Sequence, residues 1–197
     1  MNNVLIRYGA KSSYGSDIPL ACAGIITKIN MIFFSINIGI SQGLQPIISY
    51  NYGARNKERV RGAFYLLLKA SMAYAAVLWG AVMLFPKLFA GMFTSDTVLL
   101  EFTGTALRVY LAAMFIFGIQ LACQMTFMSL GNAKASILVA VMRKFVLLIP
   151  LIYIVPAILR DNQTMAVYLA EPIADILAVC FTIVLFRREF KKALNRI

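Results

Sequence analysis

Five apolar stretches, each long enough to cross a lipid bilayer as a helix, constrain this chain of 197 residues more than any other feature. A bilayer core needs about 20 helical residues to span it. In lipid every backbone polar group must be satisfied internally, which leaves helices and closed barrels as the spanning structures. The sequence therefore predicts an all-α integral membrane protein with about five transmembrane helices. The predicted spans are 18–42, 62–93, 102–130, 135–158 and 165–186.

Composition and charge support the same class. The chain is 61% hydrophobic and 14% charged, whereas a soluble domain has about a quarter charged residues. The net charge of +11 would also fit a nucleic-acid-binding protein, but the basic residues cluster at the ends of apolar runs, as membrane topology requires. The connections are short, so we expect one compact helical membrane domain over residues 18–186.

The sequence lacks residue types and motifs that many enzymes use for catalysis. It contains no histidine, the usual proton shuttle and a common metal ligand, and no P-loop or other catalytic signature. Its cysteines, Cys22, Cys123 and Cys180, lie inside apolar runs and form no CxxC pair. We expect small buried hydrophobic residues there, with no disulfide framework. The prediction is a protein that is not an enzyme and has no cofactor or metal.

The basic residues predict an orientation. The loops and tail at 51–61, 131–134 and 187–197 hold ten lysines and arginines, and the segments on the other side hold three. The positive-inside rule then places residues 187–197 in the cytoplasm as a basic tail, and residues 1–17 outside. Residues 1–17 contain no hydrophobic segment that could direct export. We therefore expect 1–17 to be the outer end of a missing helix plus a loop, and the chain to be the C-terminal piece of a longer transporter.

Residues 39–54 carry a G-x-x-Q-G-x-Q-P-x-x-x-x-N-x-G-A string, followed by a basic loop. This string resembles the end of the eighth helix of the multidrug and toxic compound extrusion (MATE) family, most closely its bacterial multidrug-efflux branch. Segments 85–94, 118–120, 143–150 and 172–175 resemble parts of the family's ninth to twelfth helices. The motif residues besides its glutamines and proline are Gly39, Gly43, Asn51, Gly53 and Ala54.

The resemblance implies the second six-helix lobe of a twelve-helix transporter. Such proteins exchange cationic or amphiphilic compounds for protons or sodium through a cavity between two lobes. The implied partners are the bilayer, the substrate and the N-terminal lobe, and the implied location is the cell membrane, with the C-terminus cytoplasmic. Two departures matter: Met128 stands where the family commonly has glutamine, and the first-lobe acidic residue linked to ion coupling lies outside this chain.

Amides inside the spans are the first candidates for the transport pathway. Gln42 and Gln45 are three residues apart and share a helical face. They could line the cavity or hydrogen-bond between helices, and the sequence favours neither. Pro46 could bend the helix near the gate or simply end it.

Further polar residues extend this list. Lys28 lies deep in the first span, with Asn30 and Asn37 near it in sequence, and is expected to face the interior. Gln120 and Gln124 are four apart in the third span and are weaker cavity candidates.

Glu171 and Asp175 are the acidic residues inside a predicted span, and their spacing of four places them on one face. Carboxylates within a membrane indicate function by default, so they could bind a proton, sodium or a cationic drug. The alternative is a structural pair with Arg143 or Lys144 of the preceding span. Because Glu171 precedes Pro172, it could also lie near the outer surface and be solvated.

Two other functions stay open. Related folds flip lipid-linked oligosaccharides, and a non-transporting membrane scaffold or assembly subunit would show similar spans. A scaffold, however, would not need paired amides at cavity spacing.

Overall fold

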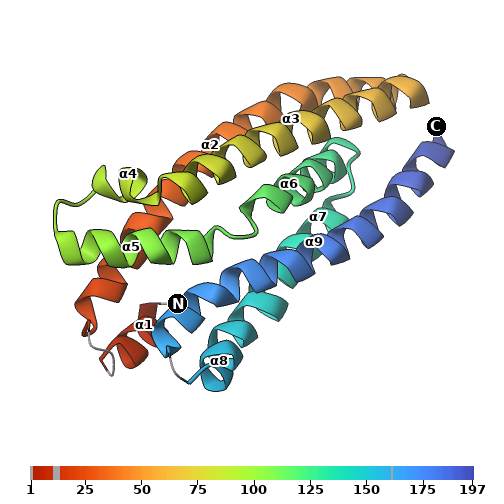
Figure 1. Cartoon of the computed structure of the whole chain (residues 1–197). Helices are drawn as coiled ribbons and strands as arrows, with labels where there is room; N and C mark the ends of the chain where they lie inside the picture. Colours follow the sequence, from red (N-terminus) through yellow and green to blue (C-terminus); the bar gives the residue numbers. More distant parts are fainter. Residues whose placement is uncertain (1, 11–13, 161) are drawn as a thin grey trace.

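The computed structural model describes residues 2–10, 14–160 and 162–197. Residues 1 and 11–13 of the predicted external segment, and Asp161 between the predicted spans 135–158 and 165–186, lie outside the described residues. Within the described part, every regular element is a helix (Figure 1). The helices are α1 (Asn2–Gly9), α2 (Asp17–Gly53), α3 (Lys57–Leu84), α4 (Pro86–Gly91), α5 (Thr97–Tyr110), α6 (Met114–Ser129), α7 (Ala133–Val141), the π-helical segment η1 (Met142–Leu148), α8 (Ile149–Ile158) and α9 (Gln163–Arg196).

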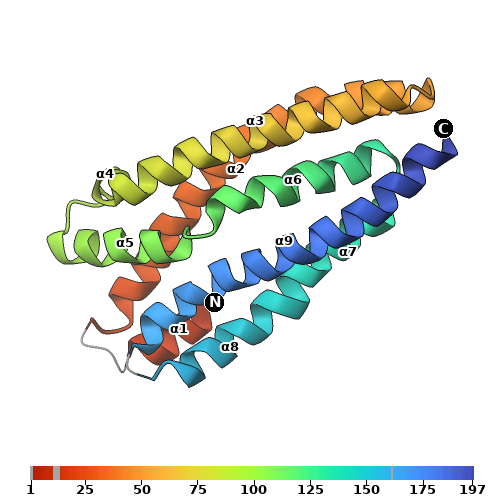
Figure 2. The same ribbon diagram turned by 45° about the vertical axis from the view of Figure 1, so that its right-hand side comes forward.

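Four helical segments are long and apolar enough to cross a membrane: α2, α3, the run from α7 through α8, and α9. The pair α5 and α6 makes a fifth span, bent by 51° at its centre (Figure 2). The prediction of an all-α membrane protein with about five spans is therefore confirmed.

Two predicted spans are interrupted. The span 62–93 breaks at Phe85, whose φ of −124° and ψ of 51° are not helical, because Pro86 disfavours helical geometry in the residue before it. The span 102–130 was predicted as one helix, but residues 111–113 form turns between α5 and α6. There the indole Nε1 of Trp79 donates a 3.0 Å hydrogen bond to the Ala112 carbonyl and satisfies a backbone group released by the bend.

Two helices extend beyond the predicted ends of their spans. α2 continues through Pro46 to Gly53, so this proline does not end the helix. α9 continues to Arg196, and the residues of the predicted tail 187–197 are therefore largely helical. α5 begins after Asp96, which caps it: Asp96 Oδ1 accepts a 2.9 Å hydrogen bond from the backbone N–H of Leu99.

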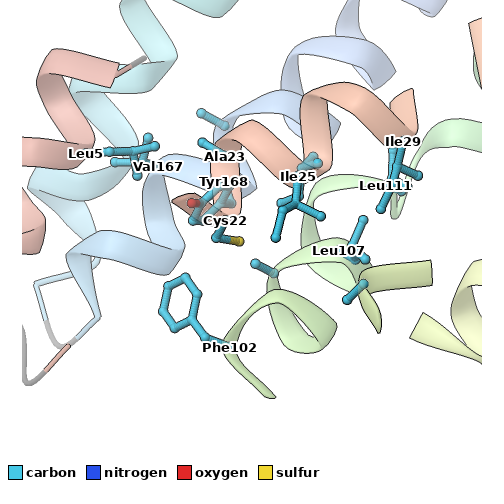
Figure 3. Close-up of a cluster of buried hydrophobic side chains, with 14 of the residues drawn as sticks. Leu5, Cys22, Ala23, Ile25, Ile29, Phe102, Leu107, Leu111, Val167 and Tyr168 are labelled. Atoms are coloured by element: carbon cyan, nitrogen blue, oxygen red, sulfur yellow. The ribbon is translucent and has the colours of Figure 1, made fainter. Parts of the chain in front are cut away.

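The largest buried cluster joins α1, α2, α5 and α9 (Figure 3). At its centre Tyr168 of α9 is fully buried, and its hydroxyl donates a 2.6 Å hydrogen bond to the Pro19 carbonyl of α2. Cys22 lies in this cluster and Cys123 in a second one, as predicted for small hydrophobic residues. Cys180 is exposed on α9, so the prediction of burial was wrong for that residue.

α3 and α6 approach each other closely at Gly118. A Cβ atom at Gly118 of α6 would lie 2.9 Å from the carbonyl oxygen of Ser71 on α3. Only glycine allows these two backbones to approach so closely, which is the usual role of small residues between membrane helices.

Candidate functional site

Three charged side chains meet inside the bundle. The Nε of Arg143 donates a 2.6 Å hydrogen bond to Oδ1 of Asp175, and its Nη2 donates a 2.9 Å hydrogen bond to Oε1 of Glu171. Their exposed fractions are 9% for Arg143, 5% for Asp175 and 7% for Glu171. We call these three residues the charge cluster.

Helical geometry assembles the charge cluster. Glu171 and Asp175 are one turn apart on α9 and face the same way. Arg143 lies in η1, where the helix widens before Pro150, a residue that cannot donate a backbone hydrogen bond. Lys144, the other predicted partner, is exposed, because adjacent helical residues point in different directions. Local π-helix within an α-helix is frequent at functional sites.

The positions of these side chains correct the prediction for Glu171 and identify the partner of the two acids. Glu171 is buried, so the expectation that it could be solvated near the outer surface was wrong. The ion pair with Arg143 is present, and it includes both acids. With both carboxylates ionised, these three side chains carry one net negative charge in an apolar surrounding, where unbalanced charge is costly.

Aromatic side chains complete the surroundings of the charge cluster. The Arg143 guanidinium carbon lies 4.6 Å from the ring centroid of Phe117 on α6, a cation–π distance. Tyr110, near the end of α5, is an electrostatic neighbour of Glu171, Arg143 and Asp175. Tyr110 was missed from the sequence because nothing in its local pattern places it beside residues more than 30 positions away. Among the described residues, no group of three His, Cys, Asp or Glu side chains could hold a metal ion.

The predicted polar residues of α2 differ in how deeply they are buried. Gln42 and Lys28 are exposed, Gln45 and Asn30 are half-buried, and Asn37 is buried. Lys28 is not packed inside this chain: its Nζ lies over the Phe93 ring, 5.9 Å from the centroid.

Two of the predicted amides lie at the contact between α2 and α6. The rings of Phe34 and Phe117 meet edge to face with centroids 5.0 Å apart. Asn37 and Gln120 each follow one turn later, on helices that run in the same direction (Figure 1). Asn37 Oδ1 and Gln120 Oε1 are buried and accept no hydrogen bond from any described residue. Gln124, a turn beyond Gln120, is half-buried.

The motif over residues 39–54 forms an exposed face of α2 and the turn at its end. Added Cβ atoms at Gly39 and Gly43 would meet nothing within 4 Å in the described part of the chain, so packing within this chain does not require glycine there. Asn51 donates a 2.8 Å hydrogen bond to the Ile47 carbonyl, one turn back in α2. α2 then ends at Gly53, with Ala54 as its C-cap.

The family follows from comparison with known proteins. The family model MatE matches residues 10–154, most of this chain. The chain belongs to the MatE family. The predicted resemblance is therefore confirmed, and MATE proteins are membrane transporters.

Individual relatives and solved structures support the same family assignment. Multidrug export protein MepA of Staphylococcus aureus is 23% identical over 158 residues, which are 80% of this chain and 33% of the relative. The FAD transporter of Shewanella oneidensis is 24% identical over 67% of this chain and 29% of the relative. The MATE multidrug transporter DinF-BH is 31% identical, with a TM-score of 0.78 over 95% of this chain and 40% of that protein.

A MATE protein solved in the straight conformation matches the whole chain with a TM-score of 0.86 at 19% identity. This chain covers 42% of that protein. The match confirms the fold as that of one lobe of a MATE transporter, and the chain spans about a third to two fifths of the length of the proteins it matches.

Proposed function

We propose that this chain forms part of a cation-coupled antiporter that exports cationic or amphiphilic compounds across the cell membrane, with a proton or sodium as the coupling ion. The charge cluster is the observation that supports the coupling role most directly. Two carboxylates share one guanidinium in a buried site, so a further cation or proton would neutralise the excess negative charge. No other cofactor enters this proposal.

The open face of α2 supports a position beside the substrate cavity. Gly39, Gln42 and Gly43 lie exposed along one helix, and packing within the chain explains none of them. We propose that this face lines the space between this lobe and an N-terminal lobe, with Gln42 and Gln45 toward the substrate. The remaining family position, Pro46, is also exposed on α2. The bilayer surrounds the other faces, and the C-terminus lies in the cytoplasm.

Transport by the complete transporter tests the proposal. Asp175→Asn should reduce export of a cationic dye or change its dependence on pH or sodium, and Asp175→Glu should retain more activity because it keeps the charge. Glu101→Gln is the matched control, since Glu101 pairs with Lys87 on the surface, where its side chain is 74% exposed. Abundance is measured alongside transport, so that loss of protein is not read as loss of coupling. Wild-type export, with unchanged ion dependence, in both Asp175→Asn and Glu171→Gln would refute the coupling role.

The chain expressed alone gives a second test. We expect it to insert into the membrane but not to export the dye, because alternating access requires two repeats that move around a site between them. Export that returns on co-expression of an N-terminal lobe would support the proposed partnership. Ion-driven export by the purified monomeric chain in liposomes would contradict it.

A further inference from the structure

A hollow of about 590 Å³ lies at the end of the bundle where the α6–α7 connection meets the last turns of α9. Figure 1 shows these two segments at the same end of the molecule as the C-terminus. The hollow plays no part in the proposed transport site. We call it the basic hollow; its charged and polar lining includes Asn132, Lys134, Glu189, Lys192 and Arg196.

The rim of the basic hollow is positively charged. Lys134, Lys192 and Arg196 bring three positive charges, and Glu189 brings one negative charge. Glu189 already has partners: Lys192 Nζ lies 4.0 Å from its Oε1, and Asn132 Nδ2 donates a 3.3 Å hydrogen bond to its Oε2. The rim therefore keeps two positive charges in excess, which favours an anionic occupant.

Part of the lining of the basic hollow is apolar. Phe127, Leu130, Leu138 and Leu185 contribute this part. Leu138 also belongs to the outer surface of α7, where it is 44% exposed. The same outer surface continues away from the rim through exposed apolar side chains: Ile137, Val141 and Phe145. An occupant that fits both parts must be anionic at one end and apolar along the rest.

We propose that the basic hollow binds one anionic phospholipid, with the phosphate held between Lys134 and Arg196 and an acyl chain lying along α7. Free inorganic phosphate would pair with the basic side chains but leave the apolar lining and the exposed surface of α7 uncovered. Basic pockets between membrane helices are known to hold acidic headgroups, and lysine or arginine near the membrane surface attracts anionic lipid. The rim also lies on the side where the basic residues of this chain gather.

Lipid retention by the purified chain tests this site. Native mass spectrometry would count phosphatidylglycerol and phosphatidylcholine molecules retained from mixed micelles of the two lipids. The site variant is Lys134→Gln with Lys192→Gln and Arg196→Gln. The control variant is Arg187→Gln with Arg188→Gln and Lys191→Gln. These three residues are exposed on α9 and do not line the basic hollow, and their substitution changes the net charge as much as that of the site variant.

We expect the wild type and the control variant to retain phosphatidylglycerol, and the site variant to retain about tenfold less, as expected for loss of about 1.4 kcal/mol. Phosphatidylcholine retention should be weak and equal in all three. Equal losses in the two triple variants would show diffuse charge attraction and overturn the proposal. Displacement of the lipid by millimolar inorganic phosphate would identify a free-anion site and also overturn it. If the site variant does not fold, the single changes Arg196→Gln and Lys191→Gln repeat the comparison, with a smaller loss expected only for the first.

Discussion

Arg143 and Asp175 are separated by 32 positions in the sequence, yet the Nε of Arg143 donates a buried 2.6 Å hydrogen bond to Oδ1 of Asp175. The same guanidinium holds Glu171 through Nη2 at 2.9 Å. One cation thus pairs with two carboxylates, so the three residues do not contribute equally to the stability of the charge cluster. Loss of either acid leaves one neutral pair, whereas loss of the guanidinium leaves two acids together without a counter-charge.

Arg143→Met should therefore lower the free energy of unfolding by about 3–5 kcal/mol, the usual effect of isolating buried charge. Glu171→Gln should cost clearly less, because Arg143 keeps Asp175. Thermal unfolding of the purified chain in detergent would measure both. The triple change of Arg143→Met, Glu171→Gln and Asp175→Asn should recover most of the loss. Equal stability of Arg143→Met and Glu171→Gln would refute this account of the charge cluster.

Gly118→Ala should destabilise the contact between α3 and α6. Its new Cβ would lie 2.9 Å from the Ser71 carbonyl oxygen, a backbone atom that cannot rotate away, and overpacking of this kind costs about 1–3 kcal/mol. Gly62→Ala is the matched control in α3, where a Cβ meets nothing within 4 Å among the described residues. That change should be neutral or stabilising by up to about 1 kcal/mol. Denaturation in mixed micelles would compare them, and the reverse order would contradict the close approach.

Tyr168→Phe should remove the hydrogen bond that joins α9 to α2 while keeping the ring in place. The hydroxyl is buried and donates to the Pro19 carbonyl at 2.6 Å, so we expect a loss of about 0.5–1.5 kcal/mol of unfolding free energy. Tyr153→Phe serves as the control because Tyr153 is 57% exposed. An unchanged melting temperature for Tyr168→Phe would show that this bond contributes nothing to stability.

The orientation can be tested by labelling single cysteines in a background lacking Cys22, Cys123 and Cys180. Asn56→Cys, in the basic connection between α2 and α3, should be protected from an impermeant thiol reagent added to intact cells, and Ser95→Cys should react. The reason is the asymmetry of ten basic residues against three. Both positions are exposed, so burial does not interfere. Labelling of Asn56→Cys from outside would reverse the orientation.

Local features of the sequence were sufficient to predict the fold. Long apolar runs predicted about five spans, and the motif at 39–54 predicted the family. Each depends on residues within a few turns of one another, because helix formation, capping and membrane insertion are local properties. The same local reasoning placed Glu171 and Asp175 on one face, as the structure has them.

The tertiary structure decided which faces of those helices are buried. Lipid is as apolar as a protein core, so the hydrophobic pattern of a membrane helix does not distinguish its lipid-facing side from its packed side. For that reason Cys180 was placed among the buried cysteines, although it is exposed on α9. The position of Glu171 before Pro172 likewise did not reveal that its side chain is buried. The choice of Arg143 over the adjacent Lys144 as the partner of both acids likewise depends on how η1 packs against α9, a contact between segments distant in sequence.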